Sequence, residues 1–212
     1  MTNTPPPCAL RVYLVRHGET AWSLTGQHTG KTDITLTPRG ERQALALAPV
    51  LRTVGFDHVL TSPALRARRT CELAGFGGRA VIDTSLAEWD YGDYEGKRSD
   101  GIRRLQPGWS VWRDGCPGGE SASQVTGRAD RLIASLRALS GNVLVFSHGQ
   151  FNCSLAVRWI GLAIAEGQHL QIDPASVSVL AFNPAHPGMP VIAQWNNVPS
   201  MRPDSDLLAK DN

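Results

Sequence analysis

Two arginines and two histidines stand where three predicted β-strands end. Arg16 and His17 directly follow an apolar run, and His148 follows a second apolar run after a single serine. Arg66 lies near the start of the predicted helix that follows a third strand. Ligands of open α/β sheets bind beyond the carboxyl ends of the strands, so we expect these four side chains to meet at one edge. They would form a cationic pocket that needs no metal ion.

A cationic pocket of this kind suits a phosphoryl group. Guanidinium groups match phosphate oxygens in a bidentate geometry. A neutral imidazole can attack phosphorus and carry the phosphoryl group covalently, while fixed cations stabilise the charge on the equatorial oxygens. A departing alkoxide also needs a proton. The segment LAEWDYGDYEG (86–96) offers four carboxyl groups for that task, those of Glu88, Asp90, Asp93 and Glu95.

Alternating strands and helices must position these side chains. Thr37 before Pro38, and Ser62 before Pro63, are typical of helix N-termini, and Gly141 is predicted to end a long helix. The predicted strands are 10–16, 57–62, 79–83, 142–147, 176–182 and 190–195, and the predicted helices are 37–55, 62–75, 119–141 and 149–162.

This order predicts an α/β fold, a three-layer α/β/α sandwich with a mostly parallel central sheet. The last two strands are expected to form a hairpin or a pair at the sheet edge. A single domain is expected over 10–197, between a disordered N-terminal arm at 1–9 and a C-terminal tail at 198–212. The irregular region 86–119 is expected to form a cap, because long loops in compact domains are usually functional.

Composition restricts the partners. The 212 residues carry a formal net charge of +2, which does not favour nucleic-acid binding. No apolar run reaches the length of a membrane span, so no membrane contact is expected. The four cysteines lack C-x-x-C spacing, which favours reduced thiols and a cytoplasmic location. We expect neither a metal nor a cofactor, since no metal-binding histidine motif occurs and two arginines would repel a cation.

Four segments together carry a resemblance to a known family. The strings LVRHGET, TSPALRARRT, LAEWDYGDYEG and VFSHG resemble the signatures of the histidine phosphatase superfamily, also called phosphoglycerate mutase-like. The likeness extends from about residue 10 to about residue 195. Longer strings, including RHGETAWSLTGQHTGKTDITLT, resemble the branch that contains sedoheptulose-bisphosphatase-like sugar phosphatases. The resemblance implies the phosphoglycerate mutase-like fold and a phosphatase for a small phosphorylated metabolite such as a sugar phosphate or bisphosphate.

The resemblance also implies roles for individual residues. His17 would be the nucleophile that becomes a phosphohistidine, and Arg16, Arg66 and His148 would hold the phosphoryl group. Glu88 would give a proton to the leaving group and act as the base in hydrolysis. The residues expected to contact the rest of the substrate are Ser23, His28, Thr29, Gly30, Tyr91, Arg113 and Gly149. No metal is implied.

Departures from the mutase pattern favour hydrolysis. Phosphoglycerate mutases have Asn where this chain has Ser23 and Gln150, and paired Arg where it has Arg113 and Asp114. A Lys expected near Ser99 is also missing. Those residues hold the second phosphate and the carboxylate of a bisphosphoglycerate, so the phosphorylated enzyme is expected to lose its phosphoryl group to water.

Several alternatives remain open at this stage. The chain could be a bisphosphoglycerate-dependent phosphoglycerate mutase, a non-catalytic module that binds phosphorylated ligands, or a phosphatase of proteins. His28 could contact the substrate or have no role in the site. Arg113 and Asp114 could form only a local ion pair, and Tyr91 could be a core residue. A homodimer is the one protein assembly left open.

Overall fold

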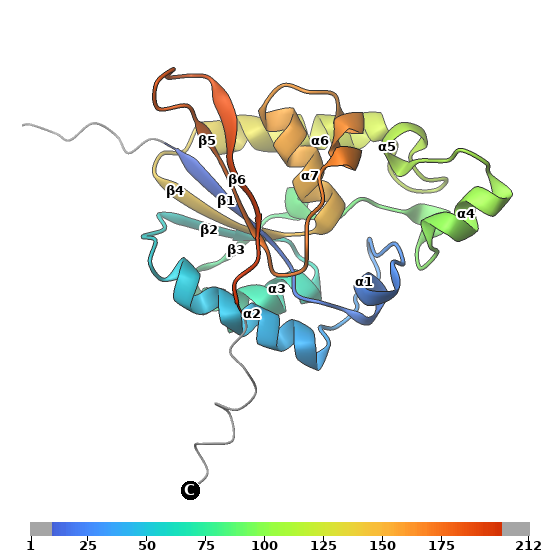
Figure 1. Cartoon of the computed structure of the whole chain (residues 1–212), viewed down its shortest axis with the longest axis horizontal. Coiled ribbons are helices and arrows are strands. Elements are labelled where there is room, and N and C mark those ends of the chain that lie inside the picture. The colour runs from blue at the N-terminus through green and yellow to red at the C-terminus, as the bar shows by residue number, and fades with distance from the viewer. Residues whose placement is uncertain (1–9, 201–212) are drawn as a thin grey trace, which may run out of the picture.

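One sheet of six strands runs through the molecule (Figure 1). The structure of the protein is a computed structural model that describes residues 10–200. The predicted arm at 1–9 and residues 201–212 of the predicted tail lie outside the described residues. The strands are β1 (Arg11–Arg16), β2 (His58–Thr61), β3 (Val81–Ile82), β4 (Asn142–Ser147), β5 (Val177–Phe182) and β6 (Pro190–Asn197), in the order β3-β2-β4-β1-β5-β6.

The four strands β3, β2, β4 and β1 pair in parallel, and β5 and β6 complete the sheet as antiparallel neighbours. The predictions of a mostly parallel sheet and of a terminal hairpin are therefore confirmed. In the central pair, Arg16 of β1 is in register with Ser147 of β4. That register places the residues that follow each strand side by side.

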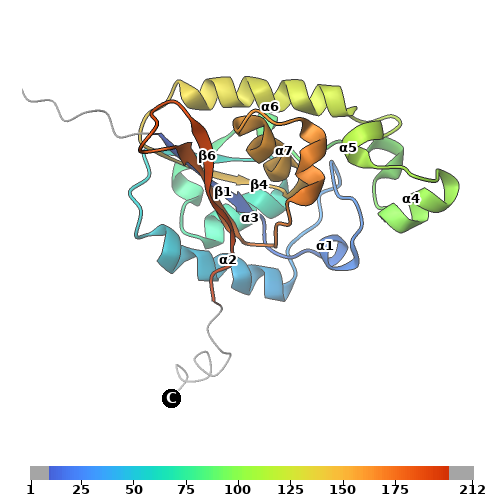
Figure 2. The same ribbon diagram turned by 45° about the horizontal axis from the view of Figure 1, so that its top comes forward.

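Helices cover both faces of the sheet, which confirms the predicted three layers. Figures 1 and 2 show α2 and α3 on one face and α6 and α7 on the other, with α1, α4 and α5 beyond one end of the strands. The helices are α1 (Ala21–Thr25), α2 (Pro38–Leu51), α3 (Leu65–Leu73), α4 (Ser99–Leu105), α5 (Val111–Asp114), α6 (Ala122–Arg137) and α7 (Gly149–Trp159), and the 3₁₀ segments are η1 (Gly77–Arg79), η2 (Thr84–Leu86), η3 (Gly92–Tyr94) and η4 (Ile164–His169).

Alternation along β1 shows how the sheet feeds two cores. Val12 and Leu14 face the cluster that contains α6 and α7, whereas Val15 faces the cluster that contains α2 and α3. All three side chains are fully buried. A strand that is apolar on both faces is what a sheet covered by two helical layers requires. None of the helices within residues 10–200 is long and apolar enough to cross a membrane.

The helix ends predicted from the sequence are confirmed in one case and wrong in two others. Thr37 caps α2 as predicted: its hydroxyl accepts a hydrogen bond from the Gly40 amide at 2.9 Å. The prediction that Ser62 caps the next helix is wrong, because α3 begins at Leu65 and has no side-chain cap. The prediction that α6 continues to Gly141 is also wrong, since α6 ends at Arg137.

The predicted cap, region 86–119, folds into short helical elements rather than one long irregular loop. It contains η3, α4 and α5, joined by turns, and it lies beyond the carboxyl ends of β1, β2 and β4 (Figures 1 and 2). Buried aromatic side chains stabilise it: Trp89 packs edge-on against Trp112 with ring centroids 5.7 Å apart. The cap is therefore a fixed wall above the strand ends.

Candidate active site

The ends of β1 and β4 bring two histidines together. The His17 amide donates to the Ser147 carbonyl at 3.0 Å, which extends the β1–β4 pairing by one residue. The rings of His17 and His148 lie with their centroids 5.3 Å apart and their planes at 65° to each other. Arg66 enters from α3, the helix that follows β2. The structure therefore brings the predicted strand-end residues to one place.

Two glycines let the loop after His17 pack against the first turn of α2. A Cβ on Gly18 would lie 2.4 Å from the Gly40 carbonyl oxygen, and a Cβ on Gly40 would lie 2.1 Å from the Glu19 carbonyl oxygen. Real Cβ atoms do not approach oxygen this closely. Any side chain at either position would push the loop, and His17 with it, away from the strand end.

His17 presents one free ring nitrogen. Its Nδ1 lies 2.8 Å from the Gly18 carbonyl oxygen, and because a carbonyl only accepts, Nδ1 carries the hydrogen. The pKa of His17 is well below its ordinary value, first because of burial and then because the Arg66 and Arg16 charges oppose protonation. The ring is therefore neutral, and its Nε2 lone pair is available.

Arg66 is fully buried and is held by main-chain oxygens. Its Nη atoms donate to the carbonyls of Thr29, Gly30 and Thr32 at 2.9–3.1 Å. Arg16 donates from Nη1 to the Ile172 carbonyl at 2.6 Å. Burial lowers the pKa of both guanidinium groups, and Glu88 partly offsets this. Each arginine is oriented through its Nη atoms, and the Nε of each is without a partner.

The side chain of His148 is held by Ser62, which the sequence predicts to cap the following helix. Ser62 Oγ lies 2.7 Å from His148 Nε2, and Nδ1 of His148 has no partner. Burial, followed by the charge of Arg66, keeps the pKa of His148 well below its ordinary value. Ser62 therefore contributes to the site instead of capping α3. The TSP sequence alone carries the helix-start signal, and only the structure reveals the contact with the histidine.

Unpartnered donors gather at this point of the molecule. Within residues 10–200, six buried side-chain nitrogen or oxygen atoms have no hydrogen-bond partner, and three of them are Arg16 Nε, Arg66 Nε and His148 Nδ1. A buried polar group without a partner costs about 1–3 kcal/mol of stability. Three such groups around one histidine are what an anion-binding site requires, because an oxyanion would satisfy them all.

Glu88 faces the same site from the cap. Its carboxylate accepts from the amides of Trp89 (2.9 Å), Gln150 (3.0 Å) and Phe151 (2.8 Å), two of which belong to the first turn of α7. Burial nevertheless raises the pKa of Glu88 above its ordinary value, although these amides and Arg66 favour the charged form. A carboxyl group with a raised pKa can hold a proton nearer to neutral pH.

A partly buried ion pair positions the Glu88 loop. Arg128 of α6 pairs with Glu120 at 2.7 Å, and it also donates to the carbonyls of Ser85, Ala87 and Glu88. Glu120 in turn accepts from the Asp90 amide at 3.0 Å. The cap segment that carries Glu88 is therefore fastened on both sides of that residue. This pair is not predictable from the sequence, because Arg128 looks like one more charged position on a long helix.

A cavity of about 390 Å³ lies over the site. The residues that line it are Arg16, His17, Ser23, Gly26, Gln27, His28, Thr29, Glu88, Tyr91, Ser99, Trp112, Gly149, Gln150, Cys153, Gly167, Gln168, Leu170 and Ile172. Arg66 and His148 are not among them, because both are fully buried beneath this surface. Its volume is in the range that small ligands occupy.

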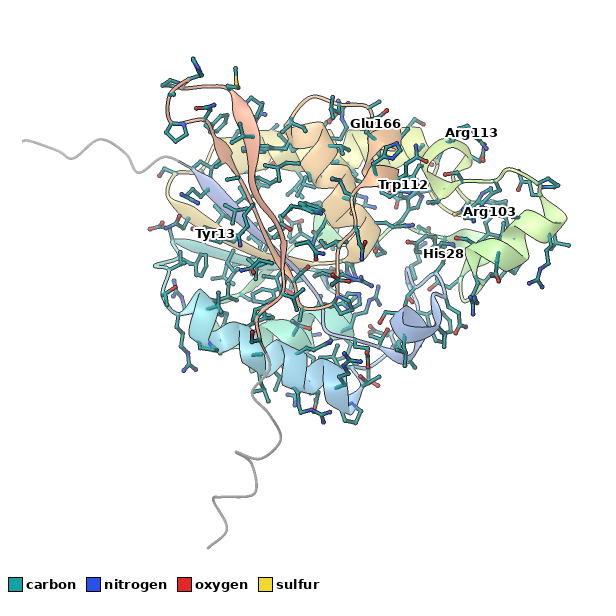
Figure 3. All side chains as sticks on the ribbon, viewed as in Figure 1. Tyr13, His28, Arg103, Trp112, Arg113 and Glu166 are labelled. Atoms are coloured by element: carbon teal, nitrogen blue, oxygen red, sulfur yellow. The ribbon has the colours of Figure 1, made fainter. Side chains whose placement is uncertain are left out.

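Five of the seven predicted substrate contacts line this cavity: Ser23, His28, Thr29, Tyr91 and Gly149. Gly30 does not; its carbonyl holds Arg66, and its own surface faces a second cavity on the other side of the Glu88 loop. Arg113 does not either. Its guanidinium pairs with Asp114 at 2.7 Å, which is the local ion pair left open above, and Figure 3 shows it at the outer edge of the molecule.

Part of the wall comes from a segment that the sequence analysis did not single out. Gln168, Leu170 and Ile172 lie in or just after η4, between α7 and β5. The segment carries no motif, and its place over the cavity follows from the packing of η4 against α5 and α7. Gly167 shows how closely it packs, since a Cβ there would lie 2.5 Å from the Trp112 ring.

Metal ligands do not gather in this region. Across the part of the chain that the structure describes, no group of three or more His, Cys, Asp or Glu side chains is arranged to hold a metal ion. The charge that an anion would meet comes from Arg16 and Arg66.

His28 is buried in the cavity wall, where it packs on Tyr91 with ring centroids 4.5 Å apart and lies 3.1 Å from Ser99 Oγ. Burial lowers its pKa from 6.5 to about 4, while Glu95 opposes and Arg103 assists the shift. The unfolded chain therefore binds a proton below pH 6.5 that the folded protein binds only near pH 4. This difference makes folding stability fall as the pH falls through that window.

We predict that His28→Gln weakens this pH dependence. From pH 7 to pH 4.5, the free energy of unfolding of the wild type should drop by about 2 kcal/mol more than that of the variant. Urea titrations at the two pH values measure both drops. Equal drops would show that His28 is protonated as easily in the folded protein as in the unfolded chain.

Comparison with known proteins agrees with this site. The family model of the histidine phosphatase superfamily (branch 1) matches residues 12–198. An acid phosphatase of Mycobacterium tuberculosis is 43% identical, over 81% of this chain and 86% of that protein. Sedoheptulose 1,7-bisphosphatase of Saccharomyces cerevisiae is 37% identical, over 75% of this chain and 70% of the yeast protein.

Solved structures give the same result. The structure of the open reading frame Rv3214 from Mycobacterium tuberculosis has a TM-score of 0.84 and 39% identity, and the match covers 90% of this chain and 98% of that one. The predictions of a phosphoglycerate mutase-like fold and of a phosphoric monoester hydrolase are confirmed at this level. The chain belongs to branch 1 of the histidine phosphatase superfamily.

Proposed function

We propose that the protein hydrolyses a small phosphorylated metabolite, of the sugar phosphate class, through a phosphohistidine on His17. The observation that carries the proposal is the set of three unpartnered buried donors, Arg16 Nε, Arg66 Nε and His148 Nδ1, beside a neutral histidine. These donors suit the three outer oxygens of a phosphoryl group in transfer. The yeast relative is named for a sugar bisphosphate, which supports the substrate class.

In the first step, His17 Nε2 attacks phosphorus, and the bond between phosphorus and the leaving oxygen breaks. The leaving oxygen takes the proton of the Glu88 carboxyl group and departs as an alcohol. The Nδ1–H bond to the Gly18 carbonyl stabilises the ring as it gains positive charge. In this mechanism His148 carries its hydrogen on Nδ1, where it can donate to a phosphoryl oxygen, and Ser62 Oγ, 2.7 Å away, donates to Nε2.

In the second step, a water molecule attacks the phosphohistidine. The Glu88 carboxylate takes a proton from this water, the P–N bond breaks, and His17 returns to its neutral form with inorganic phosphate as the product. Glu88 thus ends the cycle protonated, as it began. Its raised pKa allows both forms to take part within one cycle.

Metal independence follows from the proposal and supplies its test. With excess EDTA present, a panel of phosphorylated sugars, glycerates and nucleotides should release phosphate at the same rate as without it. The charges of Arg16 and Arg66 take the place of a metal's charge. A complete loss of activity that Mg²⁺ or Zn²⁺ restores would contradict this description of the site. Release of phosphate from no compound of the panel would instead favour a non-catalytic binding module.

The mutase alternative is tested in the same assay. Adding a bisphosphoglycerate and following the interconversion of phosphoglycerates would reveal it. Hydrolysis is supported by Arg113, which stands where mutases have paired arginines and which is engaged by Asp114 outside the cavity. Interconversion faster than phosphate release would overturn the proposal.

The setting of the enzyme is part of the same proposal. Cys71, Cys116 and Cys153 are free and buried, which supports a reducing, cytoplasmic compartment. The net charge of +2 supports a small-molecule substrate rather than nucleic acid. A homodimer is supported by β3, an edge strand whose Val81 and Ile82 are 63% and 52% exposed.

A further inference from the structure

Charge is distributed unevenly around the active-site cavity. Arg16, His17 and Glu88 lie at one end of the cavity. Arg66 and His148 are buried beneath that end. Among the other lining residues there is no lysine, no second arginine and no carboxylate. All the formal charge of this described cavity wall therefore belongs to the end that would hold the phosphoryl group being transferred.

The distal wall, which we define as Gln27, His28, Ser99, Trp112 and Gln168, offers a different chemistry. It presents amide, imidazole and hydroxyl groups together with one indole ring. Burial keeps the pKa of His28 at about 4, so its imidazole is neutral at pH 7. Cys153, which lies between the two ends of the lining on α7, is equally uncharged, because burial raises its pKa to about 12.

Three charged residues near this end of the molecule, Arg103, Arg113 and Glu166, have partners outside the cavity. Arg103 donates to the Trp109 carbonyl at 3.1 Å, and Arg113 is paired with Asp114. Glu166 lies 3.8 Å from His169 on η4. Figure 3 shows Arg103, Arg113 and Glu166 around the rim of this region, and none of them lines the cavity. The distal wall therefore lacks a cation that is already placed to meet a second anion.

We infer that the substrate is a phosphomonoester whose remaining part is uncharged and rich in hydroxyl groups, and that compounds with a second phosphate are poor substrates. The inference rests on the proposed function and names the substrate class of the same site. The inferred substrate of this chain differs from the sugar 1,7-bisphosphate for which the yeast relative is named.

Desolvation is the physical reason. Hydroxyl groups that leave water for the distal wall can exchange their hydrogen bonds for bonds to amide and hydroxyl groups, which leaves little net penalty. A second phosphate carries nearly two negative charges, and the wall offers it no cation in return. The bound second phosphate is therefore less stable than the hydrated one, whichever phosphate enters the transfer end.

The first experiment compares matched substrate pairs on the wild-type protein. Phosphate release is measured with fructose 6-phosphate against fructose 1,6-bisphosphate, and with sedoheptulose 7-phosphate against sedoheptulose 1,7-bisphosphate. After division by the number of phosphates, kcat/KM should be at least about tenfold lower for each bisphosphate, which corresponds to about 1.4 kcal/mol. Equal or higher values for the bisphosphates would overturn the inference while leaving the phosphatase proposal intact.

A second experiment adds the missing charge. Gln168 is exposed at the cavity wall, so a lysine can be accommodated there, and Gln168→Lys should raise the ratio of bisphosphate to monophosphate kcat/KM about threefold to fivefold. Gln171→Lys is the matched control: it makes the same change three residues later, at an exposed position that does not line the cavity. The control should leave the ratio unchanged.

The outcomes separate the two proposals. A ratio that rises equally in both variants would reflect net charge, and a ratio that rises in neither would show that the distal wall does not contact the second phosphate. Either result would overturn the inference. Absence of phosphate release from every sugar phosphate would contradict the proposed function itself.

Discussion

Replacing His17 by alanine should lower kcat/KM by about 10⁴-fold or more, because no other side chain can take up the phosphoryl group. In the proposed arrangement, Nε2 of His17 has a free lone pair, because Nδ1 carries the hydrogen. Ser62 occupies Nε2 of His148, the other imidazole of the site. The loss should be the same for every leaving group, since the phosphoryl acceptor itself has been removed.

The intermediate provides a direct readout of this prediction. Acid-free quenching of wild-type protein during turnover of a ³²P-labelled substrate should leave label on the chain. That label should be stable to base and lost in acid, as expected of a P–N bond. His17→Ala should carry no label, whereas His186→Ala should be labelled like the wild type, because His186 is exposed in the loop between β5 and β6. Label that is stable to acid would indicate a serine or threonine ester and would contradict the mechanism.

Glu88→Gln should slow the hydrolysis of alkyl phosphates by about 10²- to 10⁴-fold, the usual contribution of general acid catalysis. It should slow p-nitrophenyl phosphate far less, because nitrophenolate leaves without a proton. Only Glu88, of the four carboxylates in the loop, lines the cavity with His17. Single-turnover measurements ensure that phosphoryl transfer, and not product release, is compared for the two substrates.

The control for Glu88 lies two residues along the same loop. Asp90 forms a 2.6 Å ion pair with Lys31 and faces the second cavity, so Asp90→Asn should show no dependence on the leaving group. If Asp90→Asn shows that dependence and Glu88→Gln slows both substrates equally, the proton donor is Asp90. In Glu88→Gln, an NH₂ group replaces one carboxylate oxygen. It therefore faces a backbone N–H instead of accepting from it, either that of Gln150 or those of Trp89 and Phe151. A thermal unfolding curve therefore checks that the variant remains folded.

Much of the fold can be read from local patterns. Thr37 and Pro38 determine where α2 begins, because the cap and the fixed proline φ act within one turn. The apolar runs that became β1 and β4 are buried on both faces, and only a sheet covered by two layers accommodates them. That architecture by itself places Arg16, His17 and His148 at one sheet edge.

Other features depend on contacts between segments far apart in the chain, and local patterns carry no information about them. Ser62 has the signature of a helix cap, yet its hydroxyl meets His148, 86 positions later. Arg113 was predicted to contact the substrate; the adjacent Asp114 pairs with it, as the sequence already allowed, but only the fold shows that this pair lies outside the cavity. Gly30 was predicted to do the same, but the backbone that it offers is used by Arg66.

The amino-acid sequence by itself determined the kind of chemistry, because residue types at strand ends are sufficient to predict a cationic, phosphoryl-binding edge. Only the tertiary structure decided which donors are left without partners and what the far end of the cavity presents. Arg16 and Arg66 donate their Nη hydrogens to main-chain carbonyls, and that choice leaves Nε free. The distal wall is assembled by packing from the loop after α1 and from α4, α5 and η4, and packing is a property of the whole chain rather than of any segment.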